Sequence, residues 1–159
     1  MIAIACDHSA LALKKEVMAF LDENGYAYHD FGTYTEESCD YPYYAALAGR
    51  AVVSGAYEVG IVLCGTGIGV SIAANKIEGV RCALCGDTYS AAMARAHNNA
   101  NMLALGARVI GAELAKVIVE TFLTTTFLGG RHARRVDMIN ALDARVPGAL
   151  ASDPSSQKK

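Results

Sequence analysis

The chain has 159 residues, of which 53% are hydrophobic and 19% are charged, and its formal net charge is −2. This length predicts one domain, and this apolar fraction is sufficient for a core on both faces of a sheet. The small net charge excludes a global field that would recruit nucleic acid or acidic membranes.

The N-terminal segment, residues 1–5, lacks the basic region of a signal peptide, so no leader is expected. The longest uncharged apolar stretch, residues 59–74, is too short and too rich in glycine to span a membrane. Five cysteines is an odd number, and without a secretion signal they are expected as reduced thiols. The sequence therefore predicts a cytoplasmic protein.

The first half of the chain alternates between apolar runs typical of strands and amphipathic segments typical of helices. Ser9 is a candidate N-cap and Gly25 a candidate stop for the first helix, and Pro42 suits the start of the second. In chain order we expect a strand at 2–6, a helix at 9–24, a strand at 26–31, a helix at 43–54 and a strand at 58–63.

The second half continues this alternation after a short helix that begins within residues 70–75. Residues 1–145 are expected to form a single domain, and the remainder, 146–159, a flexible C-terminal tail. The later elements are expected as a strand at 80–85, a helix at 88–98, a strand at 101–105, a helix at 111–126 and a last helix at about 132–145.

Alternating strands and helices with apolar strands predict an α/β fold, a doubly wound, Rossmann-like sheet of five parallel strands in a three-layer α/β/α arrangement. Such sheets bind ligands beyond the carboxyl ends of their strands, where the strand order reverses. With the order 2-1-3-4-5, the first and third strands are neighbours across that point. The segments that follow these two strands are then expected to meet in one crevice.

The most informative segment is the glycine-rich loop CGTGIG at residues 64–69. It lies between an apolar run and a helix, so its backbone N–H groups converge on a point where an anion can bind. Cys64 borders that point, and a helix N-terminus favours its thiolate. A base beside an oxyanion cradle suits proton removal next to a carbonyl. A buried structural thiol is the alternative for Cys64.

The glycines of this loop allow two interpretations. Gly65, Gly67 and Gly69 can serve a tight turn that requires positive φ, or they can let a ligand approach the backbone, which three alternating glycines favour. The loop departs from the GxGxxG fingerprint at Val70, and the chain has no GxxxxGK[ST] loop. Asp87 lies about where a ribose-binding acid would lie, so a nucleotide-binding module remains an alternative.

Cys82 and Cys85 form a CxxC motif inside a predicted strand. Positions three apart on a strand face opposite sides of the sheet. A shared metal ion or a redox pair is therefore not expected at these two cysteines.

Two pairs that contain histidine lie at the ends of predicted elements. Asp7 and His8 follow the first strand, at the edge where ligands bind, although Asp7 can also cap the next helix. His97 and Asn98 close a predicted helix, where the macrodipole alone favours a histidine. His132, near the arginines of the last helix, has a weaker claim.

The last predicted helix opens with Arg131, Arg134 and Arg135, of which Arg131 and Arg135 are four apart and share a face. A solvated charged face is the ordinary explanation for them. Arg108 follows the fifth strand, at the same edge as the crevice. Arginines together with a histidine are suitable ligands for a phosphate monoester.

Five segments stand in order along residues 1–143: CDH at 6–8, GTYTEESCDYP at 32–42, CGTGIGVSIAANK at 64–76, HNNANMLALGARVIG at 97–111 and GGRHARRV at 129–136. On these motifs the chain closely resembles the type B ribose-5-phosphate isomerases. These belong to a wider sugar-phosphate isomerase family that includes galactose-6-phosphate isomerase subunits. Five motifs at family spacing make the resemblance highly specific.

The resemblance implies a doubly wound parallel sheet and the interconversion of ribose 5-phosphate and ribulose 5-phosphate in the pentose phosphate pathway. It also implies a homodimer, or a tetramer built from such dimers, with each active site formed by both subunits. No metal ion and no nicotinamide cofactor is needed for this reaction.

The resemblance also implies a role for each motif residue. Cys64 is the base that moves a proton between C1 and C2, and the partner subunit supplies the groups on the last helix and at 97–98. The implied set is Asp7, Thr66 and His97 for ring opening and hydroxyl protons; Gly65, Gly67, Ile68 and Gly69 for the enediolate oxygen; Tyr41 and Asn98 for the sugar; and His8, Arg108, Arg131 and Arg135 for the phosphate.

Two departures from the family pattern bear on the choice of sugar. Ser9 and Ala10 stand where many members have a glycine, and Asn99 stands where Asp is usual. Allose 6-phosphate, galactose 6-phosphate and other pentose or tetrose phosphates remain alternative substrates. Metal-dependent isomerisation and a non-catalytic sugar-phosphate-binding module are the remaining rivals, and the thiol at the cradle argues against the latter.

Overall fold

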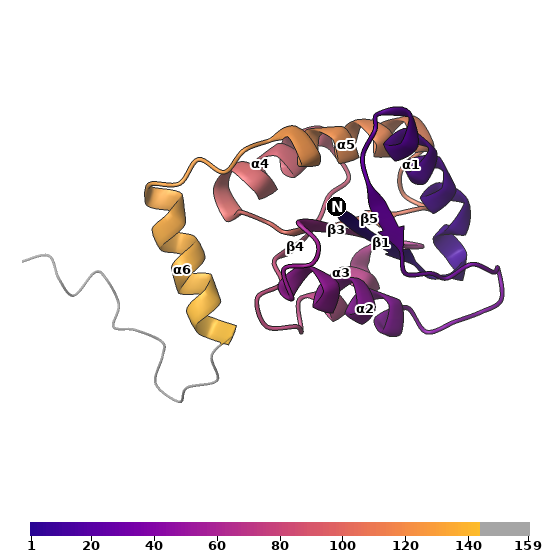
Figure 1. Ribbon diagram of the computed structural model, residues 1–159, viewed down its shortest axis with the longest axis horizontal. Coiled ribbons are helices and arrows are strands. Elements are labelled where there is room, and N and C mark those ends of the chain that lie inside the picture. Colours follow the sequence, from indigo (N-terminus) through magenta and orange to yellow (C-terminus); the bar gives the residue numbers. More distant parts are fainter. Residues whose placement is uncertain (144–159) are drawn as a thin grey trace, which may run out of the picture.

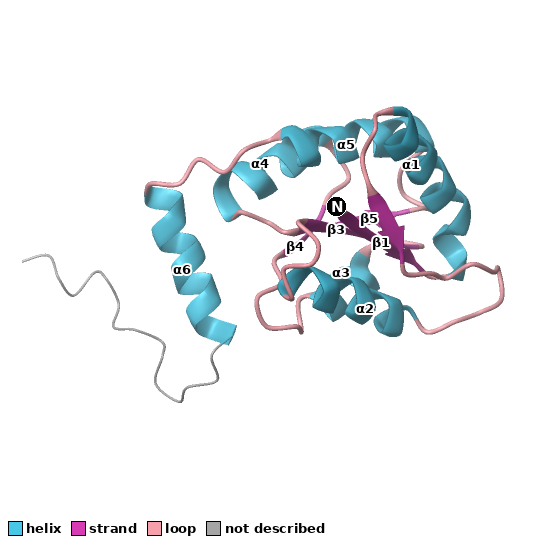
Figure 2. Ribbon diagram, in the orientation of Figure 1, coloured by secondary structure: helices cyan, strands magenta, loops and turns pink. Residues whose placement is uncertain are grey.

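The computed structural model describes residues 1–143, in which five parallel strands form one sheet between two layers of helices (Figures 1 and 2). Helices α1, α4 and α5 cover one face, and α2 and α3 cover the other (Figure 1). The elements are β1 (Ile2–Cys6), α1 (Leu11–Glu23), β2 (Tyr28–Asp30), α2 (Tyr41–Val53), β3 (Val59–Cys64), α3 (Ile68–Ala74), β4 (Cys82–Leu84), α4 (Thr88–Asn98), β5 (Met102–Gly106), α5 (Ala112–Thr124) and α6 (Arg131–Asp143).

The predicted α/β fold is confirmed, and most predicted element ends lie within two residues of the observed ones. β2 and β4 are shorter than expected, with three residues each. The predicted tail, 146–159, lies outside the described residues. No helix in the described part of the chain is long and apolar enough to cross a membrane.

The strand order is β2-β1-β3-β5-β4, so the predicted order of the last two strands is wrong. All five residues of β5 are buried, whereas the three residues of β4 are only partly buried or exposed. The fully apolar strand therefore occupies the interior position, and the short strand forms the edge. β1 and β3 are neighbours as predicted, paired from Ile2 and Val59 onward.

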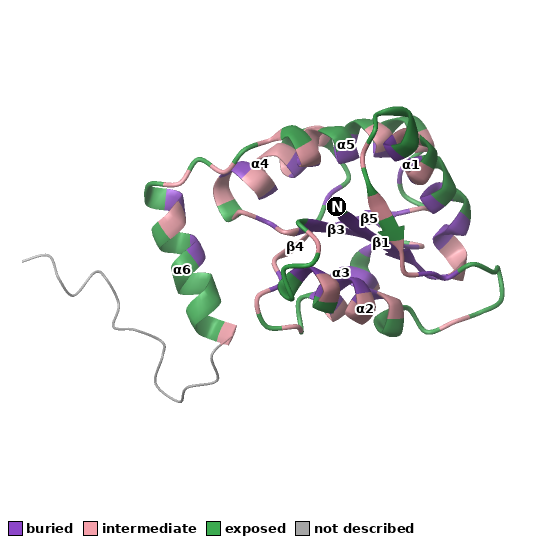
Figure 3. Ribbon diagram, viewed as in Figure 1, coloured by how far each residue is buried: buried purple, intermediate pink, exposed green. Residues whose placement is uncertain are grey.

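Alternate residues of the strands pack into two separate apolar cores, one on each face of the sheet. On the α1, α4 and α5 side, Ile4, Ile61 and Leu103 pack in one apolar cluster. On the other side, Ala5 and Val62 lie in a second cluster of mostly small side chains. β1, β3 and β5 are the most buried elements, while much of the surface of α6 is exposed (Figure 3).

The first helix begins differently from the prediction. Ser9 does not cap α1; instead the Asp7 carboxylate accepts hydrogen bonds from Ser9 N–H and Oγ, at 2.9 and 2.6 Å, and so caps a short 3₁₀ turn at 8–10. Gly25 lies just past the end of α1 with φ of +72°, as expected for a helix stop. Pro42 lies in the first turn of α2.

Candidate active site

A cavity of about 510 Å³ opens at the carboxyl ends of β1, β3 and β5. Two segments predicted to meet, the one after β1 and the one after β3, both contribute to its walls. The cavity is lined by Asp7, His8, Ser9, Tyr41, Cys64, Gly65, Thr66, Ile68, Gly69, Ile72 and Arg108. The predicted crevice is therefore present in a single chain.

Cys64 is the last residue of β3, and its side chain is buried at the edge of this cavity. Its Sγ accepts a hydrogen bond from the backbone N–H of Gly67, at 3.1 Å. Such a donor stabilises negative charge on the sulfur, and α3 begins one residue later with its N-terminus at the same end of the sheet. The geometry thus provides a partly buried sulfur with a fixed N–H donor beside open space.

Protein packing already accounts for two of the three loop glycines. Gly67 has φ of +77°, and a Cβ there would lie 2.4 Å from the Leu84 side chain. A Cβ on Gly69 would lie 2.7 Å from the ring of Tyr41. Gly65 borders the cavity beside Arg108, so it is the glycine whose missing side chain leaves room for a ligand.

The N–H groups of the loop divide into those engaged by the protein and those that remain free. Gly67 N–H donates to Cys64 Sγ, and Ile68 N–H donates to Thr66 Oγ1 at 3.3 Å. Within residues 1–143, the N–H groups of Gly65, Thr66 and Gly69 donate no hydrogen bond, and all three residues line the cavity. These amides are donors that an oxyanion in the cavity can use.

Asp7 and His8 enter the cavity from the end of β1. Asp7 is buried, and its bond to Ser9 Oγ fixes the carboxylate. His8 Nδ1 accepts a hydrogen bond from the backbone N–H of Cys39, at 3.2 Å. Sequence patterns did not predict these contacts of Ser9 and Cys39; an Asp followed two residues later by Ser is typical of an Asx turn and could have indicated that of Ser9.

Arg108 lies at the end of the β5 segment, as predicted. Its backbone N–H donates to Gly65 O at 2.9 Å, which places its side chain against the glycine loop. Tyr41 enters from the start of α2 and packs over Gly69. A cation, a hydroxyl and a carboxylate therefore line the same cavity as the sulfur.

Four predicted site residues lie outside this cavity, on α4 and α6: His97, Asn98, Arg131 and Arg135. α4 runs antiparallel to the strands, so His97 and Asn98 lie near the start of β5, whereas Cys64 lies beside the end of β5. A five-residue strand spans about 16 Å. The structure of one chain thus does not bring these four residues to the sulfur.

His97 does have a close neighbour within the chain. Its ring stacks on that of His132, with centroids 4.1 Å apart and planes 2° from parallel. Burial, with a smaller contribution from His97, lowers the pKa of His132 below its usual value. Sequence patterns favoured His132 less than His97 as a site residue. In the structure, the ring of His132 packs directly against that of His97.

Three of the other four thiols lie in less favourable environments for reaction. Burial raises the pKa of Cys6 to about 12, that of Cys82 to about 12 and that of Cys85 to about 11. As predicted for the CxxC motif, Cys85 belongs to one core cluster and Cys82 packs against the other. These two cysteines therefore face opposite sides of the sheet.

The residue considered for nucleotide binding has a structural role. Asp87 caps α4 by accepting hydrogen bonds from Ser90 N–H and Oγ, both at 2.7 Å. These bonds hold the pKa of Asp87 below its usual value. Among residues 1–143, no group of three His, Cys, Asp or Glu side chains is placed to hold a metal ion.

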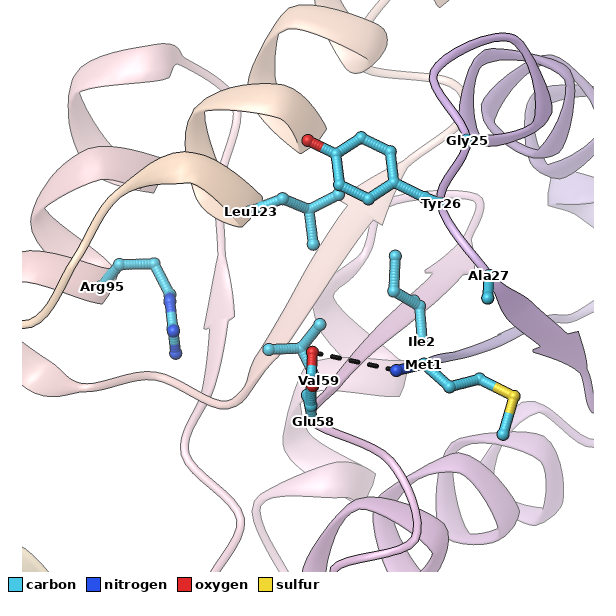
Figure 4. Close-up of a pocket in the computed structure, with 9 residues that line it drawn as sticks. All are labelled: Met1, Ile2, Gly25, Tyr26, Ala27, Glu58, Val59, Arg95 and Leu123. Atoms are coloured by element: carbon cyan, nitrogen blue, oxygen red, sulfur yellow. Dashed lines mark ion pairs between the residues drawn. The ribbon is translucent and has the colours of Figure 1, made fainter.

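A second cavity, of about 430 Å³, lies at the amino ends of the strands (Figure 4). Met1, Glu58 and Arg95 contribute its charged groups, and the N-terminal nitrogen lies 3.8 Å from a Glu58 carboxylate oxygen. None of the predicted catalytic or substrate-binding residues lines it. The predicted residues that do share a cavity are those at the carboxyl ends of the strands.

Comparison with known proteins identifies the family of this chain. A family model described as Ribose/Galactose Isomerase matches residues 2–139. Ribose-5-phosphate isomerase B of Escherichia coli strain K12 is 48% identical over 144 residues, which cover 91% of this chain and 97% of that protein. D-erythrulose-4-phosphate isomerase of Pectobacterium atrosepticum is 46% identical over 139 residues, or 87% of this chain and 91% of that protein. The solved structure of Clostridium thermocellum ribose-5-phosphate isomerase B matches with a TM-score of 0.88 and 51% identity, covering 89% and 96% of the two chains.

Proposed function

The chain belongs to the ribose/galactose isomerase family and is a sugar-phosphate isomerase, and from this premise we propose that it interconverts ribose 5-phosphate and ribulose 5-phosphate through Cys64. The observation that carries the proposal is the Gly67 N–H donating to Cys64 Sγ at 3.1 Å, at the wall of the cavity. A sulfur held in this way is suited to act as a base.

In the proposed reaction, the Cys64 thiolate removes the proton from C2 of the open-chain aldose. The electrons of the broken C–H bond form the C1=C2 double bond, and negative charge moves to O1. The free N–H groups of Gly65 and Thr66 stabilise this enediolate. The thiol then returns its proton to C1, and transfer of the O2 proton to O1 leaves the carbonyl at C2.

The remaining cavity groups have supporting roles in this proposal. Asp7 and the Thr66 hydroxyl handle the protons of ring opening and of the substrate hydroxyls. Tyr41 lines the sugar site. His8 and Arg108 contribute donors for the phosphate, which is acceptor-only as a dianion.

A homodimer with shared sites explains the four residues that lie away from the sulfur. Arg131 and Arg135 are exposed on α6, and His97 and Asn98 close α4. A partner subunit that placed these side chains at the mouth of the cavity would complete the phosphate and sugar contacts. The exposed apolar residues Ile68 and Ile72, beside the cavity, are consistent with such a covering surface.

The relative that acts on D-erythrulose 4-phosphate favours a tetrose phosphate as the second candidate substrate. Purified protein should be incubated in D₂O with ribose 5-phosphate and, separately, with erythrulose, allose and galactose phosphates, and followed by proton NMR. We expect the fastest turnover with ribose 5-phosphate, with deuterium entering the carbon beside the carbonyl, without added cofactor and in the presence of a chelator. No turnover of any aldose or ketose phosphate would contradict the proposal.

A further inference from the structure

The loop between β2 and α2 contacts the imidazole of His8. Residues 31–40 connect β2 to α2 and bulge from the right-hand side of the molecule in Figure 1. Near the end of this loop, the backbone N–H of Cys39 points at His8 Nδ1, at 3.2 Å. Cys39 Sγ lies 3.8 Å from the same nitrogen. Both groups meet the ring at Nδ1, which leaves Nε2 without a contact from this loop.

This contact determines where the ring proton lies. A nitrogen that accepts an N–H bond carries a lone pair, so the proton of a neutral imidazole is then on Nε2. We propose that the Cys39 backbone N–H is a positioning group that fixes His8 in the Nε2–H tautomer, so that the ring offers a donor to the substrate phosphate. The phosphate contact of His8 rests on the proposed function; the tautomer does not.

A backbone amide is well suited to this task because it can only donate. A hydroxyl or carboxamide partner could rotate and support either tautomer, whereas an N–H supports one. The other tautomer would turn a lone pair toward the phosphate, whose oxygens are also acceptors. The apparent affinity for the phosphate therefore scales with the fraction of His8 in the competent form.

The loop is anchored in the protein core at its beginning, and α2 follows directly after its end. Lys14 is 1% exposed, and its Nζ lies 2.7 Å from both carboxylate oxygens of Asp30 and 2.7 Å from Thr33 O. Thr33 N–H in turn donates to Cys6 O at 2.8 Å. The loop thus leaves the sheet from a fixed point and ends in the first turn of α2.

The direct test is ¹⁵N NMR of the free protein labelled at histidine, with His8 assigned from the spectrum of His8→Gln. At a pH where the ring is neutral, the proposal expects the His8 Nδ1 signal at the position of a bare nitrogen and the Nε2 signal at that of a protonated one. An Nδ1–H tautomer, or an even mixture, would overturn it. This readout requires no variant of the loop and no activity.

Two variants at one position separate the amide from the thiol. Cys39→Ala removes the sulfur and keeps the N–H, so the tautomer and KM should match the wild type. Cys39→Pro removes the N–H, so the Nδ1 and Nε2 signals should shift toward a mixture and KM for the sugar phosphate should rise about two- to fivefold with kcat changed less. A tautomer that changes in Cys39→Ala, or that persists in a folded Cys39→Pro, would contradict the assignment to the amide.

The result also distinguishes this inference from the proposed function. If the wild type shows the Nε2–H tautomer but no sugar phosphate is isomerised, the positioning of His8 stands and the proposed reaction fails. If isomerisation is observed and the tautomer is the other one, the reaction stands and the inference fails.

Discussion

The rings of His97 and His132 stack face to face, with centroids 4.1 Å apart, and join the end of α4 to the beginning of α6. His132 precedes Arg135 by less than one turn of α6. The stack therefore links His97 to the helix that carries the exposed arginines. If the site of a partner subunit binds substrate through His97 or through the α6 arginines, the stack would bring both sets of side chains to that site together.

Subunit complementation tests that consequence. Cys64→Ala and the double variant Arg131→Ala/Arg135→Ala are each expected to be inactive. After exchange of subunits, a mixed dimer would have one site with both lesions and one intact site, so activity should approach about a quarter of the wild-type value. No recovery, with exchange confirmed by mass spectrometry, would show that each subunit builds its own site.

Removal of the proposed base should abolish the chemistry and spare the fold. Cys64→Ala deletes a small buried group, and we expect a fall in kcat of at least about 10³-fold with little change in substrate binding. Rate measurements with ribose 5-phosphate and calorimetric titration of substrate would establish both. Cys82→Ala serves as the matched control and should retain activity; near-normal kcat in Cys64→Ala would reject the thiol as the base.

The buried ion pair between Lys14 and Asp30, at the start of the loop that carries Cys39, should contribute more to stability than an exposed ion pair. Asp30→Ala leaves the ammonium of Lys14 buried without its carboxylate, so the free energy of unfolding should fall by about 3–5 kcal/mol. Glu16→Ala breaks an exposed pair with Lys116 at 3.0 Å and should have little effect. Denaturant unfolding compares the two, and equal losses would argue against a special role for Lys14.

Alkaline pH should destabilise the protein through Cys6, which is fully buried. Burial raises its pKa to about 12 in the folded chain, from 9.0 for the ordinary thiol. Between these values the unfolded chain releases the proton and the folded chain retains it, so stability falls as pH rises, by about 1.4 kcal/mol per pH unit from this group. Below pH 8 both forms are protonated and the effect vanishes.

The measurement is Tm across pH 7.5 to about 10.5 for the wild type and for Cys6→Ala. Other groups also titrate in this range, so the difference between the two slopes is the informative quantity. Above about pH 9, the Tm of Cys6→Ala should fall less steeply with rising pH than the Tm of the wild type. Parallel slopes would show that the Cys6 thiol is not held in its protonated form.

The fold was largely predictable because its strands are recognisable in the sequence as apolar runs between amphipathic segments. Strand adjacency was predictable for β1 and β3, since the order 2-1-3 at the start of a doubly wound sheet makes them neighbours. The positions of β4 and β5 depended on which strand is wholly buried, and the predicted range 80–85 made β4 look longer than its three residues.

The site was predictable where its residues follow strands directly, as Asp7, Cys64 and Arg108 do. The contact between Cys39 and His8 was not, because it joins residues 31 positions apart through the path of a loop. The proposed role of His97 requires a second chain, whose contribution no periodicity within one sequence can reveal.

A further consequence concerns Gly106, the last residue of β5, where a Cβ would lie 2.6 Å from the backbone carbonyl of Thr66. Any side chain there would push the Thr66 carbonyl away from the end of the sheet, and with it the Gly67 N–H of the same peptide, which donates to Cys64 Sγ. A survey of tolerated substitutions should therefore score Gly106 as intolerant as a catalytic position. That sensitivity would arise from the close packing of Gly106 against the backbone of Thr66, without any contact between Gly106 and the sugar.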